Sequence, residues 1–334
     1  MQQLVKDNRA IVITGAAGFI GANVIRYLNS NGITELILVD DFGKSQKWKN
    51  LLGTQYREFI SKYELFDWLE GRQGAIQAFI HLGACSSTTE ADGDYFYRNN
   101  YRFSIRLLEY ALTHNHRFIY ASSAATYGLG EMGFSDSEES IESLMPLNMY
   151  GYSKQMFDLW CKRQGILQQI VSLKYFNIFG PYESHKGHMA SMVFHMTNQI
   201  RERGFVSLFQ STDSQIDHGE QSRDFLYVKD AAKITCSFLY TKASGIFNVG
   251  SGFTTTWNKL AALVAEVLKK DLSIRYIPMP LSIRGQYQNK TQADVRKLYK
   301  HLQRVGISLH TLESAISDYI NNYLTVQNYA DLTR

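Results

Sequence analysis

AIVITGAAGFIG, residues 10–21, is the stretch that decides the fold of this chain. A short apolar run ends in a turn that carries Gly15, Gly18 and Gly21, and the helix-like stretch ANVIRYLN follows. Glycines at this spacing permit a tight turn, a close approach of the backbone to a pyrophosphate, and close packing of a helix on a strand. The start of the helix then offers its N–H groups to the anion. The stretch therefore predicts a dinucleotide-binding unit, with an ordinary strand–helix turn as the alternative.

Asp40 supports the dinucleotide-binding interpretation, because it ends the next apolar run about 20 residues after the last glycine, where a ribose-binding acid is expected. An acid at this position normally accepts the ribose 2′-hydroxyl, which favours NAD. Lys44, Lys47 and Lys62 follow it and are able to neutralise the 2′-phosphate of NADP instead. A loop with solvated lysines would have the same sequence pattern, so the residues alone do not decide between NAD and NADP as the cofactor.

Short apolar runs alternate with helix-like stretches through the first two-thirds of the chain. The helix-like residues 101–113 place apolar side chains near one face, and the apolar runs are residues 10–13, 36–39, 78–80, 118–121 and 170–173. This alternation predicts right-handed crossovers and a doubly wound α/β fold, a parallel Rossmann-type sheet with helices on both faces.

The pattern loosens after residue 176, although an apolar run at 245–249 and a helix-like stretch at 256–270 follow. We expect residues 1–176 to form a dinucleotide-binding Rossmann domain, joined by returning elements near 224–250. Residues 177–334 are expected to form mainly a smaller, interleaved substrate-binding domain.

The composition excludes several classes of protein. The 334 residues include 35 Lys+Arg and 31 Asp+Glu, a formal net charge of +4, and no basic run marks a nucleic-acid or membrane-surface partner. Cys85, Cys161 and Cys236 lie far apart without CxxC spacing, which indicates neither a disulfide framework nor a zinc site. No apolar stretch approaches the roughly 18 residues of a spanning helix. We expect a cytoplasmic protein that binds no metal, membrane or nucleic acid.

The stretch YGYSK, residues 150–154, is the second informative one, and it follows the serine-rich stretch YASSAATYG at 120–128. Residues four apart share a face of a helix, so Tyr150 and Lys154 are neighbours. Tyr150 is the candidate acid/base, because an adjacent ammonium and a cationic nicotinamide both favour its phenolate. Lys154 is also suited to hold the nicotinamide ribose, and Ser123 to hydrogen-bond the hydroxyl that is oxidised.

The glycine turn, the serine-rich stretch and the Tyr–Lys pair together resemble the extended short-chain dehydrogenase/reductase superfamily, whose catalytic set is Ser/Thr, Tyr and Lys. The resemblance implies catalytic roles for Ser123, Tyr150 and Lys154. Dehydratases of the superfamily carry an Asp-Glu pair beside the catalytic hydroxyl residue, where this chain has Ala124 and Ala125. Dehydration is disfavoured, because no carboxylate is placed there to act as a second acid/base.

Longer strings narrow the resemblance to one family. They are GACSSTTE at 83–90, ASSAATYG at 121–128, LNMYGYSK at 147–154, YFNIFGP at 175–181, HKGHMAS at 185–191 and QYQNKTQAD at 286–294. With the glycine turn, these strings resemble the ADP-glycero-manno-heptose 6-epimerase family over essentially the whole chain. The resemblance implies that NADP oxidises the C6 hydroxyl of an ADP-heptose and that the same hydride returns to the opposite face, in a pathway that supplies the inner core of lipopolysaccharide.

The same resemblance implies a homo-oligomer, often a pentamer, and a second acid/base at Lys186, which by default would be a solvated lysine. The implied contacts to the cofactor are Gly15, Gly18, Phe19, Ile20, Gly21, Asp40, Asp41, Lys47, Lys62, Leu82, Gly83, Ala84, Cys85, Ser86, Asn99, Lys154, Ile178 and Lys186. The implied contacts to the substrate are Ser123, Asn177, His188, His195, Phe209, Gln210, Ser211, Thr212, Arg223 and Tyr287.

Several of these positions allow a second interpretation. Arg223 suits a diphosphate, because its planar fork binds phosphate oxygens in pairs, but a surface arginine paired with Asp224 is the alternative. Leu82 and His188 depart from the family, which has an acid and a small hydroxyl residue there, and the tract 213–221 is longer than usual. His81, beside a predicted strand end, is interpreted as a packed histidine.

Two other functions remain open from the sequence. A different sugar-nucleotide epimerase, such as a UDP-hexose 4-epimerase, would share the fold and the chemistry but not the substrate. A non-catalytic NADP-binding regulator would share only the fold, and such proteins usually lack the Tyr–Lys pair that this chain carries.

Overall fold

The computed structural model describes residues 8–88 and 90–326, so Thr89 of the string at 83–90 lies outside the described residues. Its centre is a seven-stranded sheet of order β10-β6-β5-β4-β1-β2-β3, and every neighbouring pair in it is parallel. The strands are β1 Ala10–Thr14, β2 Leu36–Asp40, β3 Glu58–Ser61, β4 Ile76–His81, β5 Arg117–Ser123, β6 Val171–Tyr175 and β10 Gly245–Val249. The predicted doubly wound α/β fold is confirmed.

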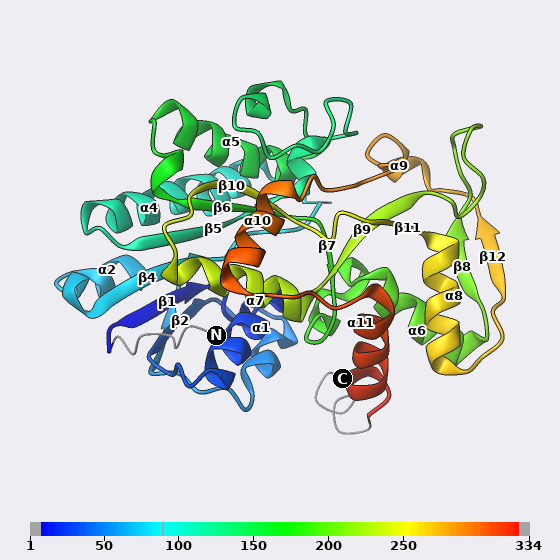
Figure 1. The fold of residues 1–334 in the computed structure, drawn as a ribbon, viewed down its shortest axis with the longest axis horizontal. Helices are drawn as coiled ribbons and strands as arrows, with labels where there is room; N and C mark the ends of the chain where they lie inside the picture. Colours follow the sequence, from blue (N-terminus) through cyan, green and yellow to red (C-terminus); the bar gives the residue numbers. More distant parts are fainter. Residues whose placement is uncertain (1–7, 89, 327–334) are drawn as a thin grey trace.

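Helices cover both faces of this sheet (Figure 1), and strand β1 shows why. Its Ile11 and Ile13 belong to one apolar core, whereas Ala10 and Val12 belong to another, because successive side chains of a strand point to opposite faces. The first core includes residues of α1 Phe19–Ser30, α7 Val228–Ser237 and α10 Arg296–Val305. The second includes residues of α2 Leu65–Leu69, α4 Phe103–Thr113 and α5 Met149–Arg163.

The predicted elements agree with the structure in place, and they differ at their ends. Five strands run further than their apolar runs. Four of them finish on polar residues, Thr14, Asp40, His81 and Ser123, and β6 continues through Lys174 to Tyr175. The helix predicted at 101–113 is α4, which begins two residues later, at Phe103. A π-helical turn at Tyr97–Arg102 precedes it and joins it to α3 Gly93–Phe96. Strand β3 was not predicted, since EFIS holds only two apolar residues and is mostly not buried.

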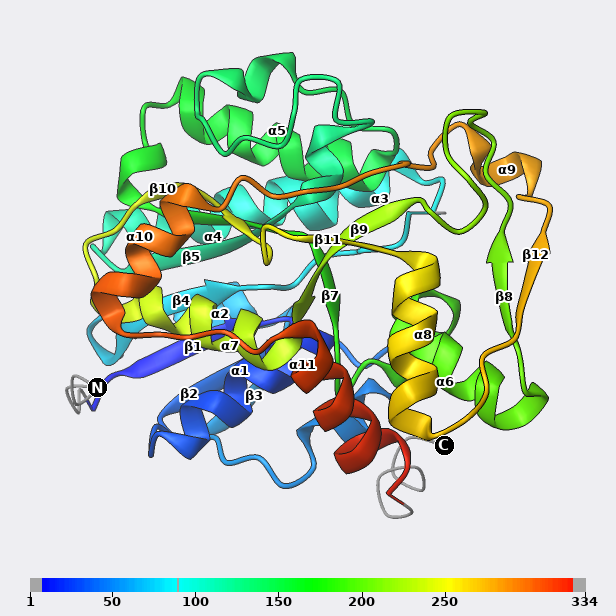
Figure 2. The same ribbon diagram turned by 45° about the vertical axis from the view of Figure 1, so that its right-hand side comes forward.

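A smaller lobe lies beside the carboxyl ends of the sheet strands (Figure 2). It contains the three-stranded sheet β11-β9-β7, from Thr254–Thr256, Ser222–Tyr227 and Asn177–Phe179, and the parallel pair β8 Val206–Phe209 and β12 Ile274–Ile277. Helices α6 Met192–Arg203, α8 Trp257–Leu268 and α11 Leu312–Tyr319 enclose a third apolar core, and α9 Leu281–Arg284 lies near β12. Within the described residues, no helix has the length and apolar character needed to cross a membrane.

Candidate active site

The glycine turn between β1 and α1 leaves room that any side chain would fill. Gly15 has φ +68°, and a Cβ there would lie 2.6 Å from the backbone nitrogen of Gly83. Gly18 is the N-cap of α1 and has no side chain to satisfy the first N–H groups of the helix. The first turn also holds no acid. The N–H groups that no side chain caps and the positive end of the helix dipole therefore fit the pyrophosphate of a dinucleotide.

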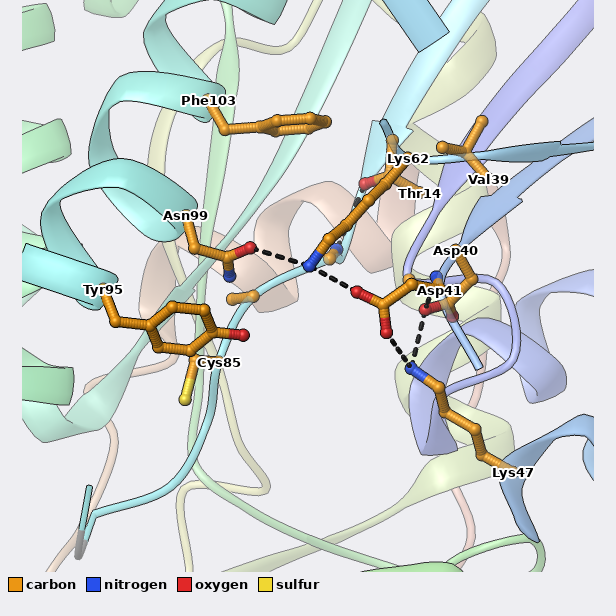
Figure 3. A pocket seen from close by; sticks show the side chains of 13 residues that line it. Thr14, Val39, Asp40, Asp41, Lys47, Lys62, Cys85, Tyr95, Asn99 and Phe103 are labelled. Carbon is orange, nitrogen blue, oxygen red and sulfur yellow. Dashed lines mark hydrogen bonds and ion pairs between the residues drawn. The ribbon is translucent and has the colours of Figure 1, made fainter. Parts of the chain in front are cut away.

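A cavity of about 110 Å³ follows this turn along the carboxyl ends of β1, β2 and β4 (Figure 3). Many of the predicted cofactor residues line it: Gly15, Asp40, Asp41, Lys47, Lys62, Gly83, Ala84, Cys85 and Asn99. Thr14, Val39, Tyr95 and Phe103 complete the lining and had not been predicted. The structure therefore brings half of the predicted cofactor contacts into one cavity.

Two lysines meet two carboxylates in this cavity. Asp40 accepts hydrogen bonds from the backbone N–H groups of Ala17, at 2.8 Å, and Asp41, at 2.8 Å, and its Oδ1 lies 2.7 Å from Nζ of Lys47. Lys62 pairs with Asp41 and donates to Oδ1 of Asn99 at 3.1 Å. Contacts with Lys62 and Lys47 hold the pKa of Asp41 below its usual value although burial opposes this. Neither lysine is solvated as a loop lysine would be, whereas Lys44 is exposed.

Asn100, which the sequence analysis missed, joins the predicted cofactor segment to helix α5. Its Oδ1 accepts from the Cys85 backbone N–H at 2.8 Å, and its Nδ2 donates to the Cys85 carbonyl and to Oγ of Ser153, at 2.9 and 3.0 Å. It is completely buried and lies in the π-helical turn, a form that is common at functional sites. The pair Asn99-Asn100 gave no sign in the sequence of which asparagine faces inward.

His81 is a packed histidine, as predicted. Its Nδ1 lies 2.5 Å from Oγ1 of Thr14, and its Nε2 lies 2.8 Å from Oγ of Ser104. Complete burial lowers its pKa to about 3, so the ring is neutral over the physiological range. Thr14 also accepts from the Gly83 backbone N–H at 3.1 Å, which holds the segment 82–86 against the glycine turn.

Ser123 and Tyr150 are brought together by the start of helix α5. Asn148 caps the helix by accepting from the Gly151 backbone N–H at 2.9 Å. A Cβ on Gly151 would lie 2.6 Å from the Ala125 carbonyl oxygen, so glycine lets the helix approach the turn after β5. Burial raises the pKa of the Tyr150 phenol, and a side-chain hydrogen bond with Ser123 lowers it. The phenol and the serine hydroxyl therefore share one site.

Lys154 lies one helical turn after Tyr150 and is only 2% exposed. Its Nζ is 4.7 Å from the centroid of the Tyr120 ring. Burial lowers the pKa of this ammonium to about 7, against the opposing effect of Asp158 and Cys85. In such a poorly solvated environment, the attraction between an ammonium and a nearby phenolate is stronger than in water, so a Tyr150 phenolate would stabilise the charged form of Lys154.

A buried polar network lies under these residues and was not predicted. Asp158 accepts from Oγ of Ser122 and Oγ of Ser172, both at 2.7 Å, and its Oδ2 is 3.3 Å from Nζ of Lys174. Lys174 also donates to Oγ1 of Thr126 at 2.6 Å. The network ties helix α5 to strands β5 and β6, and so supports the geometry of the Ser123 and Tyr150 site.

Lys186 lies in the 3₁₀ segment Ser184–Met189, between β7 and α6. Its Nζ is 5.2 Å from the centroid of the Phe19 ring, at the start of α1. Met189 of the same segment lies 3.9 Å from Oγ1 of Thr88, after the predicted cofactor segment. Burial lowers the pKa of Lys186. The lysine therefore faces the glycine turn and is not the solvated lysine of the alternative interpretation.

The substrate side contains a compact group of predicted residues around Arg223. The guanidinium carbon lies 5.0 Å from the Tyr287 ring centroid and 5.4 Å from that of Trp257, and the Phe209 and Tyr287 centroids are 6.4 Å apart. Trp257 donates to the Tyr287 hydroxyl at 2.8 Å and had not been predicted. Nη1 of Arg223 donates to the Ser222 carbonyl at 2.9 Å, and stacking on aromatic faces does not use the other guanidinium donors, which suit phosphate oxygens.

Arg223 does not pair with Asp224, the alternative that the sequence allowed. The Asp224 carboxylate instead accepts from the backbone N–H groups of Ser251, Gly252 and Ala293, at 2.7, 2.9 and 2.9 Å. Neighbouring residues of a strand point to opposite faces, and this separates the two side chains.

The remaining predicted substrate residues are more dispersed. Asn177 uses its Nδ2 to bind the Asp224 carbonyl and Oγ1 of Thr291, both at 3.1 Å. Ser211 bonds within its own loop to Asp213, at 3.0 Å. Four other predicted substrate contacts are partly or fully exposed: His188, His195, Gln210 and Thr212. The long tract 213–221 is a turn-rich connection between β8 and β9.

The strand order 3-2-1-4-5-6 with its glycine turn defines this chain as a member of the Rossmann class of dinucleotide-binding folds. The model of the NAD dependent epimerase/dehydratase family matches residues 11–250. This chain belongs to that family.

Three known proteins show the similarity at full length. Two are named ADP-L-glycero-D-manno-heptose-6-epimerase: one from Fusobacterium nucleatum is 42% identical over 95% of this chain and 99% of its own, and one from Nitratidesulfovibrio vulgaris is 42% identical over 94% and 97%. The crystal structure of the Helicobacter pylori ADP-L-glycero-D-manno-heptose-6-epimerase superposes with a TM-score of 0.80, at 28% identity, over 98% of this chain and 100% of that one.

Proposed function

We propose that this protein inverts C6 of the heptose in ADP-D-glycero-D-manno-heptose to give the L-glycero epimer, for the inner core of lipopolysaccharide. The names of the 42% identical relatives support the substrate. The observation that carries the reaction type is that two candidate acid/base groups come from different elements: Tyr150 lies on α5 beside Ser123, and Lys186 lies over Phe19 at the start of α1. Once the ketone has turned over, its oxygen lies in a new position, and a second acid/base group there can return the proton.

We propose further that the nucleotide cofactor is NADP and that the sheet lobe, residues 1–176 with elements near 224–250, binds it. When bound, the nicotinamide accepts the hydride from C6 and returns it. The glycine turn would hold the pyrophosphate, and Lys47 and Lys62 would bind the 2′-phosphate on the far side of Asp40. The smaller lobe, mainly residues 177–334, would hold the sugar nucleotide, with Arg223 on its diphosphate.

The protein groups then carry the protons. Tyr150 takes the C6 hydroxyl proton while Ser123 hydrogen-bonds the same oxygen, and the Lys154 ammonium lowers the cost of the phenolate. After the ketone presents its other face, Lys186 gives a proton to the carbonyl oxygen as the hydride returns. Burial lowers the pKa of Lys186, which favours the neutral amine that would act as the base in the reverse direction. The two groups exchange roles between the two directions of a reversible epimerisation.

The proposed function is tested by incubating the purified protein with ADP-D-glycero-D-manno-heptose and following the C6 proton signals by NMR. We expect conversion to an equilibrium mixture of the two epimers without added cofactor, since the reaction has no net redox change. Absence of conversion, together with rapid turnover of UDP-galactose, would replace this function by that of a UDP-hexose 4-epimerase.

The cofactor assignment predicts a selective effect of the cavity lysines. Changing Lys47 and Lys62 together to Ala should weaken NADP binding about 10- to 100-fold, as expected when charge-assisted hydrogen bonds to a phosphate are lost and Asp40 and Asp41 are left to repel it. NAD binding should change little. Dissociation constants from calorimetry measure both, with Lys49→Ala in the same loop as the control. Equal losses for the two nucleotides would contradict the assignment.

A further inference from the structure

Glu183 is a completely buried acid in the connection from β7 to α6, and the proposed reaction does not use it. Its Oε1 accepts from the Gly180 backbone N–H at 3.2 Å and from Oγ of Ser191 at 2.7 Å. Its Oε2 accepts from the Ser191 backbone N–H at 2.6 Å. Because Gly180 begins the loop and Ser191 caps α6, one carboxylate joins the two ends of the loop.

Burying a carboxylate is costly, so an acid in this place needs compensation. Burial raises the pKa of Glu183, while Lys186 and the donors from Ser191 and Gly180 lower it. Three N–H and O–H donors aimed at two oxygens suit an ionised carboxylate, which only accepts. An apolar side chain would fill the same space without this cost, but it would leave the two N–H groups unpaired.

The loop that Glu183 closes is the one that carries Lys186. The Lys186 backbone N–H donates to the Glu183 carbonyl at 2.9 Å, so the two residues form one 3₁₀ turn. The carboxylate raises the pKa of the Lys186 ammonium, against the effect of burial. Other titratable groups near this loop include His185, Lys47 and Arg26, whose guanidinium carbon lies 3.8 Å from the Tyr182 ring centroid. Burial, with Lys186 and Lys47, lowers the His185 pKa to about 4, so His185 is neutral.

The far side of the loop is also anchored. Nδ2 of Asn50 donates to the Ala17 carbonyl at 2.9 Å and to the Tyr182 carbonyl at 3.2 Å, and it lies 3.1 Å from Nδ1 of His185. The loop is therefore held against the glycine turn by Asn50 and closed on itself by Glu183.

We propose that Glu183 is a positioning residue for Lys186: its carboxylate closes the loop from Gly180 to Ser191 and thereby holds the ammonium over the glycine turn in the orientation and charge state that proton transfer requires. This inference rests on the proposed role of Lys186 as the second acid/base. It assigns Glu183 no contact with substrate or cofactor.

Three variants separate the effect of the Glu183 charge from the effect of its side-chain length and hydrogen bonds. Glu183→Gln removes the charge and sets an N–H against the Ser191 N–H. Glu183→Asp keeps the charge but is one methylene shorter. Ser191→Ala removes one donor and leaves the acid in place. Glu202→Gln, an exposed acid on α6, is the matched control.

Epimerase kinetics and a labelling experiment are the two measurements. Glu183→Gln should lower kcat about 10- to 100-fold, in line with the cost of misplacing a catalytic group by about 1 Å, with KM for the sugar nucleotide little changed. Glu183→Asp should recover part of kcat, and Ser191→Ala should lose less than Glu183→Gln. The pH dependence of Lys186 acetylation by acetic anhydride, followed by mass spectrometry, should shift to lower pH in Glu183→Gln and stay near wild type in Glu183→Asp.

The outcomes distinguish this inference from the proposed function. Labelling needs no turnover, so it tests the coupling of Glu183 to Lys186 even if the wild-type protein does not epimerise ADP-heptose. If Glu183→Gln matches Glu202→Gln in both kcat and the pH dependence of Lys186 labelling, the inference is overturned. If Glu183→Gln does not fold, the inference is tested with Glu183→Asp and Ser191→Ala. Wild-type kcat and wild-type Lys186 labelling in both of these variants would also overturn the inference.

Discussion

Changing Tyr150 to Phe is expected to lower kcat for epimerisation about 10²- to 10⁴-fold, the usual contribution of a positioned general acid/base. The phenol is the group whose hydroxyl hydrogen-bonds with Ser123, and Phe keeps the ring but has no proton to exchange. Packing at the start of α5 is preserved, because Gly151 and the Asn148 cap are unchanged. Conversion of ADP-D-glycero-D-manno-heptose, followed by NMR in single-turnover and steady-state assays, measures the loss.

Tyr152→Phe is the matched control for this experiment. Tyr152 lies on the same helix two residues away and is 49% exposed, so it cannot share the face of Tyr150 and Lys154. It should turn over at the wild-type rate. The amount of nucleotide that remains bound after purification should be the same in both variants and in the wild type. A Tyr150→Phe protein that epimerises as fast as Tyr152→Phe would show that the phenol is not the essential acid/base.

Changing Lys186 to Met is expected to have an effect of similar size, about 10²- to 10⁴-fold on kcat, because Lys186 is the group proposed to protonate the ketone oxygen as the hydride returns. Met has nearly the length of Lys and keeps the apolar contact over the Phe19 ring while it removes the ammonium. KM for the sugar nucleotide should rise much less than kcat falls. The two effects are separated by measuring initial rates over a range of substrate concentrations.

Lys270→Met serves as the control, since Lys270 is exposed after α8 and far along the chain from the site. Raising the pH should not restore the activity lost in Lys186→Met. The loss should also be the same at low and high salt, because only an effect of surface charge would depend on salt. Full epimerase activity of Lys186→Met would leave Tyr150 as the one acid/base and contradict the proposed role of Lys186.

Local spacing was enough to predict the glycine turn, the strands that flank it, the acid that ends β2, and the pairing of Tyr150 with Lys154. Each of these depends on residues within one strand–turn–helix unit or one helical turn, where backbone geometry alone decides which side chains meet. The same locality limited the predicted strand ends. Apolar periodicity stops at the last apolar residue, whereas the strands continue into Thr14, Asp40, His81 and Ser123, which the site uses.

The spacing of residues in the sequence did not predict the contacts between segments that are far apart along the chain. The sequence contains Asn99 and Asn100, but only the π-helical turn decides that Asn99 meets Lys62 while Asn100 joins Cys85 to Ser153. Trp257 has no motif of its own and enters the site because it directly follows β11, which pairs with β9 and places Thr255 opposite Arg223.

What this sequence determined by itself is therefore the class of fold, the glycine turn and the placement of Tyr150 and Lys154 one turn apart on a helix, since these depend on near neighbours along the chain. What only the tertiary structure decided is the environment of each group. Lys186 is a partly buried lysine over Phe19 and not a fully solvated one, and Glu183 closes its loop. Burial and charge are properties of the folded neighbourhood, and the residues that supply them here come from strands and helices far apart along the chain.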